Sequence, residues 1–147
     1  LDEYKYLSGI PNVGPVTIAA LLIGTGDLTR YSSASQVLKV LGYDVCEYSS
    51  GRWRGQRHIG KHGNPISRKY LYQAGVRCAK SNGIYHEKFM DFHSRGKPAP
   101  KVYVALACEL VRVMFSLVRD RRFFERDYIP QNQRGKAVRN GQTQIRG

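Results

Sequence analysis

Apolar residues recur at helical spacing along most of this chain. The longest apolar run, VYVALACELVRVMFSLV at 102–118, holds only two charged residues, Glu109 and Arg112, and is typical of a buried core helix. Shorter helices are predicted near 1–8, 15–23, 33–41, 65–81 and 84–94. The pattern predicts a mainly α fold, a compact domain of about five helices.

Local signals place the ends of two of these helices. Ser32 or Ser33 is a suitable N-cap and Gly42 a suitable stop for the helix at 33–41. Asn64 as N-cap, with Pro65 at the first helical position, starts the next helix, which Asn82-Gly83 ends. On that helix one side gathers Ile66, Tyr70, Leu71, Ala74 and Cys78.

The first thirty residues resemble a helix-hairpin-helix. Two predicted helices flank the turn IPNVG, and Pro15 suits the first turn of the second helix. In such motifs the hairpin amides and the following helix N-terminus hold a nucleic-acid phosphate, so Gly14 is a candidate phosphate contact. The alternative is a helical hairpin that only packs.

A glycine-rich segment at 43–63 lacks helical period, and we expect an ordered loop with a short β-hairpin. Tyr48, Trp53 and Ile59 could anchor it, and a loop this long in a small domain is usually functional or disordered. The predicted organisation is one domain at 1–129, with the loop between its second and third helices, and a basic disordered tail at 130–147.

The charge of the chain indicates a polyanionic partner. It carries 24 Lys+Arg against 11 Asp+Glu, a net charge of +13, which favours nucleic acid over the ribosomal and membrane-surface alternatives. Three cysteines without a CxxC motif suit a reducing compartment. No signal peptide is evident, and the run at 102–118 is too short and too charged to span a membrane. Because the first residue is Leu1 and not Met, we expect a fragment of a longer protein.

The loop also carries the parts of a phosphodiester-cleaving site. Two serines and a glycine, Ser49-Ser50-Gly51, precede a run of basic residues, and a further arginine lies in the first turn of the next helix. A serine hydroxyl in electropositive surroundings can attack phosphorus, and guanidinium forks hold phosphate oxygens. From these residues alone, a loop that only contacts phosphate stays open. The basic residues are Arg52, Arg54, Arg57, His58, Lys61, His62 and Arg68.

Metal sites are disfavoured. His58 and His62 with Cys46 lack a fourth zinc ligand. Glu87 and Asp91 lie one helical turn apart among basic residues, which favours a salt-bridged surface over Mg²⁺. Glu109 and Arg112 should form a buried pair.

Four blocks occur in order: SGIPNVGPVTIAALL, YSSASQVLKVLGYDVCEYSSG, HIGKHGNPISRKYLYQAG and RGKPAPKVYVALACELVRVMFSLVRD. Together, over roughly 7–120, they resemble the C-terminal domain of insertion-sequence transposases of the 110/116/902 family. The resemblance implies an RNA-guided DNA recombinase, in which this domain supplies a serine nucleophile. A separate N-terminal nuclease-like domain would bind Mg²⁺, and no cofactor is expected in this chain.

The resemblance also implies roles for single residues. The family's tyrosine, any residue, serine, glycine pattern falls on 48–51, so Ser50 is the implied nucleophile and Ser49 its competitor. The family's downstream basic element falls on 58–63, with His58 where arginine is frequent. The implied nucleic-acid contacts are Gly51, Arg54, His58, Lys61, Asn64 and Arg68, beside Gly14 from the hairpin.

The predicted function is therefore that of a transposase domain that acts on DNA. We also expect a guide RNA, a homo-oligomeric full-length protein, no membrane association, and a cytoplasmic, nucleoid-associated location in a prokaryote. The alternative from another class is a non-catalytic helix-hairpin-helix module that grips DNA or RNA by its backbone.

Overall fold

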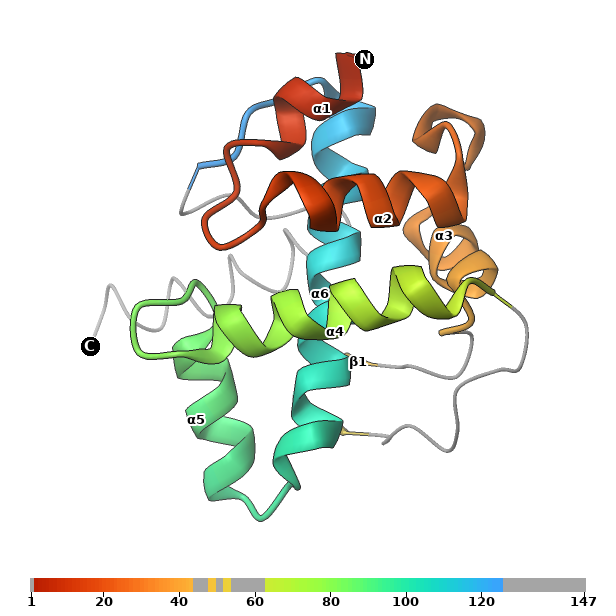
Figure 1. Cartoon of the computed structure of the whole chain (residues 1–147). Helices are drawn as coiled ribbons and strands as arrows, with labels where there is room; N and C mark the ends of the chain where they lie inside the picture. Colours follow the sequence, from red (N-terminus) through yellow and green to blue (C-terminus); the bar gives the residue numbers. More distant parts are fainter. Residues whose placement is uncertain (1, 44–47, 50–51, 54–62, 126–147) are drawn as a thin grey trace.

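A computed structural model of the chain describes residues 2–43, 48–49, 52–53 and 63–125 (Figure 1). The predicted tail at 130–147 lies outside these residues. The described elements are α1 (Asp2–Leu7), α2 (Pro15–Thr25), the 3-10 turn η1 (Leu28–Arg30), α3 (Ala34–Leu41), β1 (Tyr48–Ser49), β2 (Arg52–Trp53), α4 (Pro65–Ala79), α5 (His86–Ser94) and α6 (Ala99–Asp120).

Helix α6 is the centre of the fold. Its middle is buried on almost every side, from Val102 through Leu106, Leu110 and Met114 to Val118. Figure 1 shows α4 crossing it and α2 running beside α4, with α1 near the C-terminal end of α6 and α5 beside its N-terminal half. The mainly α prediction is confirmed, and so is the buried core helix, because an element apolar all round can only be covered by its neighbours.

The crossings are close because small residues lie at them. At Gly75 of α4, an added Cβ would meet the Tyr103 carbonyl oxygen of α6 at 2.7 Å. Ser67 of α4 is fully buried and donates its hydroxyl to the Ala20 carbonyl of α2 at 2.6 Å. These contacts fix α4 against both α2 and α6.

The predicted helix ends are largely confirmed. Ser33 caps α3 by accepting from the Gln36 amide, and Gly42 ends that helix in the left-handed region. Asn64 caps α4, and Pro65 begins it. However, α4 ends at Ala79, before the predicted stop at Asn82-Gly83, because Lys80 is already extended.

The face assigned to α4 was partly wrong. Leu71, Ala74 and Cys78 are buried as predicted, but Ile66 is 59% exposed. Ser67 takes the buried position one residue on, since its hydroxyl finds a partner on α2.

The buried acid of α6 is paired as expected. The Glu109 carboxylate lies 3.9 Å from Arg112 Nη1 and 3.7 Å from Lys88 Nζ, which reaches it from α5. The sequence pattern gave no sign of the second cation. Within the described residues, no helix is long and apolar enough to cross a membrane.

Candidate functional site

The predicted site falls mostly outside the described residues. Ser50, Gly51, Arg54, His58 and Lys61 lie there, as do the zinc candidates Cys46, His58 and His62. Asn64, Arg68 and Gly14 lie within the described residues, so the structure shows the surroundings of these three predicted site residues.

A strand pair brackets the serine. β1 and β2 pair antiparallel, with Tyr48 opposite Trp53 and Ser49 opposite Arg52. The loop containing them joins α3 to α4, the same two helices that were predicted to flank it; they are the third and fourth helices, and not the second and third, because the short α1 counts as a helix of its own. β1 also contacts α6, so the backbone just before residue 50 lies against the central helix (Figure 1).

The N-terminal end of the loop is held by α3. Gly42 has a φ of 94°, a value that favours glycine, and it lets the Tyr43 amide return to the Leu38 carbonyl at 2.8 Å. Tyr43 is 2% exposed, and its hydroxyl donates to the Arg68 carbonyl at 3.5 Å. The chain therefore enters the loop from a buried anchor.

The C-terminal end is held at the same place. Gly63 has a φ of 95°, and a Cβ there would meet the Leu41 carbonyl oxygen at 2.5 Å. The Arg68 guanidinium donates from Nη1 to that same carbonyl at 3.0 Å. We call Leu41, Tyr43, Gly63 and Arg68 the loop base, because together they fasten both ends of residues 43–63 to one point.

Helix α4 begins at this loop base. The Asn64 side-chain oxygen accepts from the amides of Ile66 at 2.9 Å and Ser67 at 3.4 Å. The first turn of α4 carries no acidic residue, so the partial positive charge of the helix N-terminus is not neutralised from within that turn. Asn64 and Arg68 thus have structural roles, and their predicted contacts to nucleic acid remain predictions.

Gly14 lies apart from the loop base. In its turn, the Val13 amide donates to the Ile10 carbonyl at 3.2 Å, with Asn12 at a φ of 67°. Arg77 holds this turn, donating from Nε to the Asn12 carbonyl and from Nη2 to Thr17, each at 3.1 Å.

The turn and the loop base therefore lie toward opposite ends of α4. The nine residues from Arg68 to Arg77 correspond to about 14 Å along a helix axis. The structure joins Asn64 and Arg68 to the loop but does not bring Gly14 to them. A phosphate held at Gly14 would belong to a different part of a bound nucleic acid.

Titratable groups elsewhere offer little chemistry. Asp91 forms an ion pair with Arg95 at 3.1 Å, which supports the salt-bridged surface expected on α5. Burial raises the pKa of Cys78 to about 11, so that thiol is a poor nucleophile. In the described part of the chain, no three His, Cys, Asp or Glu residues group as a metal site would require.

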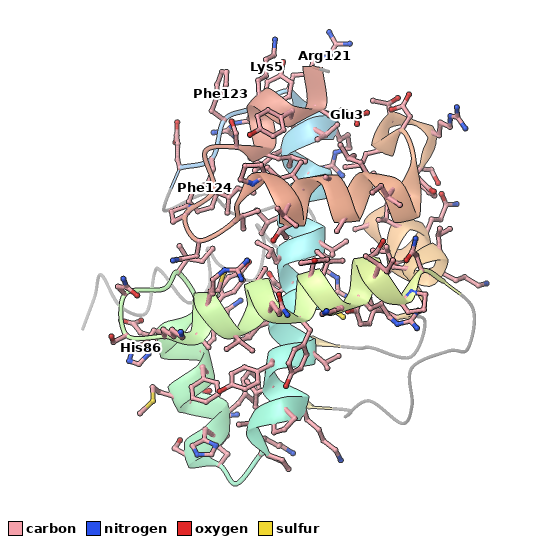
Figure 2. The ribbon with its side chains drawn as sticks, viewed as in Figure 1. Glu3, Lys5, His86, Arg121, Phe123 and Phe124 are labelled. Atoms are coloured by element: carbon pink, nitrogen blue, oxygen red, sulfur yellow. The ribbon has the colours of Figure 1, made fainter. Side chains whose placement is uncertain are left out.

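One carboxyl pair was missed by the sequence reasoning. Glu3 of α1 and Asp27, the N-cap of η1, share a hydrogen bond. They line a pocket of about 560 Å³ between α1, the end of α2 and the end of α6. Figure 2 shows Glu3 near Lys5 and Arg121 at this end of the molecule. Nothing in the sequence could pair two acids that lie on different elements.

The pair holds one proton near neutrality. Burial, followed by the hydrogen bond and charge of Asp27, raises the pKa of Glu3 to about 7. Hydrogen bonds from Glu3 and Thr29 lower the pKa of Asp27 to about 2. Protonated Glu3 therefore donates to ionised Asp27 and ties α1 to η1.

This tie predicts a pH dependence of stability. The contribution of Glu3 is fully present below its ordinary pKa of 4.5 and is lost as the pH rises through about 7. The contribution of Asp27 is present above 3.8 and is lost as the pH falls through about 2. The difference in melting temperature between wild type and Glu3→Gln should therefore change between pH 4.5 and about pH 7. Wild type should lose stability relative to the variant from about pH 5 to about pH 7.5.

Glu87→Gln, at an exposed position of α5, is the matched control and should track wild type across the same range. Identical pH slopes for wild type and Glu3→Gln would show that the proton is not shared.

Comparisons with known proteins cover most of the chain. A sequence model described as "Transposase IS116/IS110/IS902 family" matches residues 4–90, more than half of the chain. Among curated proteins, the "Insertion element IS110 uncharacterized 43.6 kDa protein" of Streptomyces coelicolor is 26% identical over 81% of this chain and 29% of its own length. The "Insertion element IS116 uncharacterized 44.8 kDa protein" of Streptomyces clavuligerus is 24% identical over 84% of this chain and 31% of its own.

A third relative has a named activity. The "Pilin gene-inverting protein" of Moraxella bovis is 25% identical over 82% of this chain and 38% of its own length. The chain thus spans about a third of the length of these curated relatives. No solved structure matches significantly.

Proposed function

Because the chain belongs to the transposase IS116/IS110/IS902 family, we propose that it is the DNA-binding catalytic domain of a DNA recombinase. In this proposal Ser50 is the nucleophile for strand cleavage and exchange. The relative named for pilin gene inversion supports a reaction that rearranges DNA.

The observation that carries the proposal is the loop base. Tyr43 at one end of the loop hydrogen-bonds to the Leu38 and Arg68 carbonyls, and Gly63 at the other end lies against the Leu41 carbonyl that Arg68 binds, so the root of the loop is pre-organised. A nucleophile needs such a frame, because a misplacement of about 1 Å can cost on the order of 10²-fold in rate. A loop that only grips phosphates has less need of one.

The proposed step conserves the energy of the phosphodiester bond in a phosphoserine link. The Ser50 hydroxyl oxygen attacks phosphorus in line and forms a new phosphorus–oxygen bond. The bond from phosphorus to one strand oxygen breaks, and that oxygen leaves with a proton as a strand hydroxyl. A hydroxyl from the exchanging strand then attacks the phosphoserine, which rejoins DNA and returns the proton to Ser50 without ATP.

Cations of the loop complete the proposed site. Arg54, His58 and Lys61 follow the serine in sequence and would hold the phosphate oxygens, with the Gly51 backbone close to phosphorus. Arg68 and Asn64 position the loop from its base. The family resemblance implies a Mg²⁺ ion held by a separate nuclease-like domain, and within the described residues no three His, Cys, Asp or Glu residues group as such a site would require.

Partners follow from the same proposal. DNA is the substrate, and the charge of +13 suits it. A guide RNA, a homo-oligomer and a cytoplasmic, nucleoid-associated location are further parts of the proposal, and they come from the family resemblance.

A second candidate is a non-catalytic helix-hairpin-helix module. It is favoured by the turn at 10–14, which Arg77 holds between α1 and α2 and which exposes Pro11 and Asn12. In that case the hairpin would bind the nucleic-acid backbone, and the loop would add contacts without chemistry.

Trapping the covalent intermediate separates the two candidates. The complete protein is incubated with a DNA duplex carrying its recombination site, denatured, and digested for peptide mass mapping. We expect a nucleotide adduct on the peptide that contains Ser50. Binding without any adduct would support the module, and an adduct on Ser49 or Tyr48 would overturn the assignment of Ser50.

A further inference from the structure

A column of aromatic rings joins α4, α5 and α6. Phe89 and Tyr103 stack with ring centroids 5.3 Å apart and planes 4° from parallel. His93 stacks on Phe89 at 5.4 Å and 12°, and Tyr72 meets Tyr103 edge-on at 5.8 Å. The three inner rings are partly buried, whereas His93 is exposed, so the column ends at the surface in an imidazole.

The exposed ring is held in place. The His93 Nδ1–H donates to the Lys97 carbonyl at 3.3 Å, which fixes the tautomer and the plane of the ring. The backbone around it is closed by two hydrogen bonds, from Gly96 to the His93 carbonyl at 3.0 Å and from Lys97 to the Phe92 carbonyl at 3.2 Å. This is a Schellman ending, with Gly96 at a φ of 87°. The ring therefore loses little freedom when a ligand stacks on it.

The surroundings of His93 are cationic. From 92 to 108 the chain has no acidic residue, and it carries Arg95, Lys97 and Lys101 at the corner between α5 and α6. Asp91 lies just before this stretch, but it forms an ion pair with Arg95. An exposed flat ring beside lysines is the combination by which proteins bind single strands, with bases on rings and phosphates on cations.

We propose that the α5–α6 corner is a binding site for single-stranded DNA, in which an unpaired base extends the column by stacking on His93 and its phosphates lie on Lys97 and Lys101. The choice of DNA rests on the proposed function, because strand exchange leaves DNA bases unpaired. A duplex could not use the site in this way, since its bases are already stacked.

The experiment compares oligonucleotides that differ only in their bases. Fluorescently labelled twelve-residue oligothymidylate and an abasic strand of equal length are titrated with the complete protein by anisotropy. The salt is set high enough to weaken the general attraction of so basic a chain. We expect His93→Ala to weaken oligothymidylate binding about fivefold or more, and abasic binding less than twofold. His93→Phe should keep the preference, and Lys101→Ala should weaken both strands equally.

Phe123→Ala is the matched control. Phe123 is also an exposed aromatic residue, 61% exposed, but it follows the opposite end of α6 and should leave both affinities unchanged. A His93→Ala protein that binds both strands as wild type does, or that loses both equally, would overturn the site. Tighter, His93-dependent binding of the matching RNA would overturn the choice of DNA. Adduct formation at Ser50 is scored separately, so a failure here leaves the proposed function standing.

Discussion

Ser50→Ala in the complete protein is expected to abolish DNA strand exchange while leaving DNA binding nearly intact. Without the hydroxyl no phosphoserine can form, so strand exchange should be lost completely and not merely slowed. One hydroxyl contributes about 0.5–1.5 kcal/mol as a hydrogen-bonding group, which is at most about tenfold in an affinity supported by many phosphate contacts. A recombination assay and a binding titration on the same preparation measure both quantities.

Ser49→Ala is the matched control for this prediction. It removes the same group one residue earlier, from the strand that pairs with Arg52, and should reduce exchange only slightly. If Ser49→Ala were inactive and Ser50→Ala active, the family pattern would have been placed one residue out of register. If both remained active, neither serine would be the nucleophile.

Much of the fold was predictable because its signals are local. The caps at Ser33, Gly42 and Asn64 depend on residues within four positions of each other. The burial of α6 follows from an apolar run too continuous for a one-sided helix. Signals of this kind can be recognised in the sequence without knowing which helices pack against each other.

The contacts that build the loop base were not predictable in this way. Arg68 reads in the sequence as one more basic residue near a serine, and it was predicted to contact nucleic acid. The sequence does not show that its Nη1 donates to the carbonyl of Leu41, 27 residues away. The exposure of Ile66 and the burial of Ser67 likewise depend on α2, which no period within α4 can reveal.

The same holds for the carboxyl pair and the aromatic column. Glu3 and Asp27 each read as an ordinary surface acid until α1 and η1 are placed together. His93 read only as part of an amphipathic helix. Its stacking on Phe89 is local, but the parallel Tyr103 beneath comes from α6.

Gly63 gives the sharpest test of the loop base, and Gly63→Ala is expected to cut strand exchange on the order of 100-fold while the domain stays folded. The substitution combines two costs. A non-glycine residue at a φ of 95° is strained by about 1–3 kcal/mol. The new Cβ would also lie 2.5 Å from the Leu41 carbonyl oxygen and 2.8 Å from Arg68 Nη1, so the base itself must shift. Because both contacts lie at the root of the loop and not in the core around α6, the displacement should reach the loop before it unfolds the helices.

Gly26→Ala separates strain from packing. Gly26 also has a positive φ, of 71°, but a Cβ there would meet nothing within 4 Å. Both variants should therefore melt a few degrees below wild type, because each carries the backbone strain. Only Gly63→Ala should lose strand exchange, since only there does the methyl group push against the point that holds residues 43–63. Equal loss of exchange in the two variants would show that strain alone decides activity, and full activity of Gly63→Ala would show that the loop does not depend on its base.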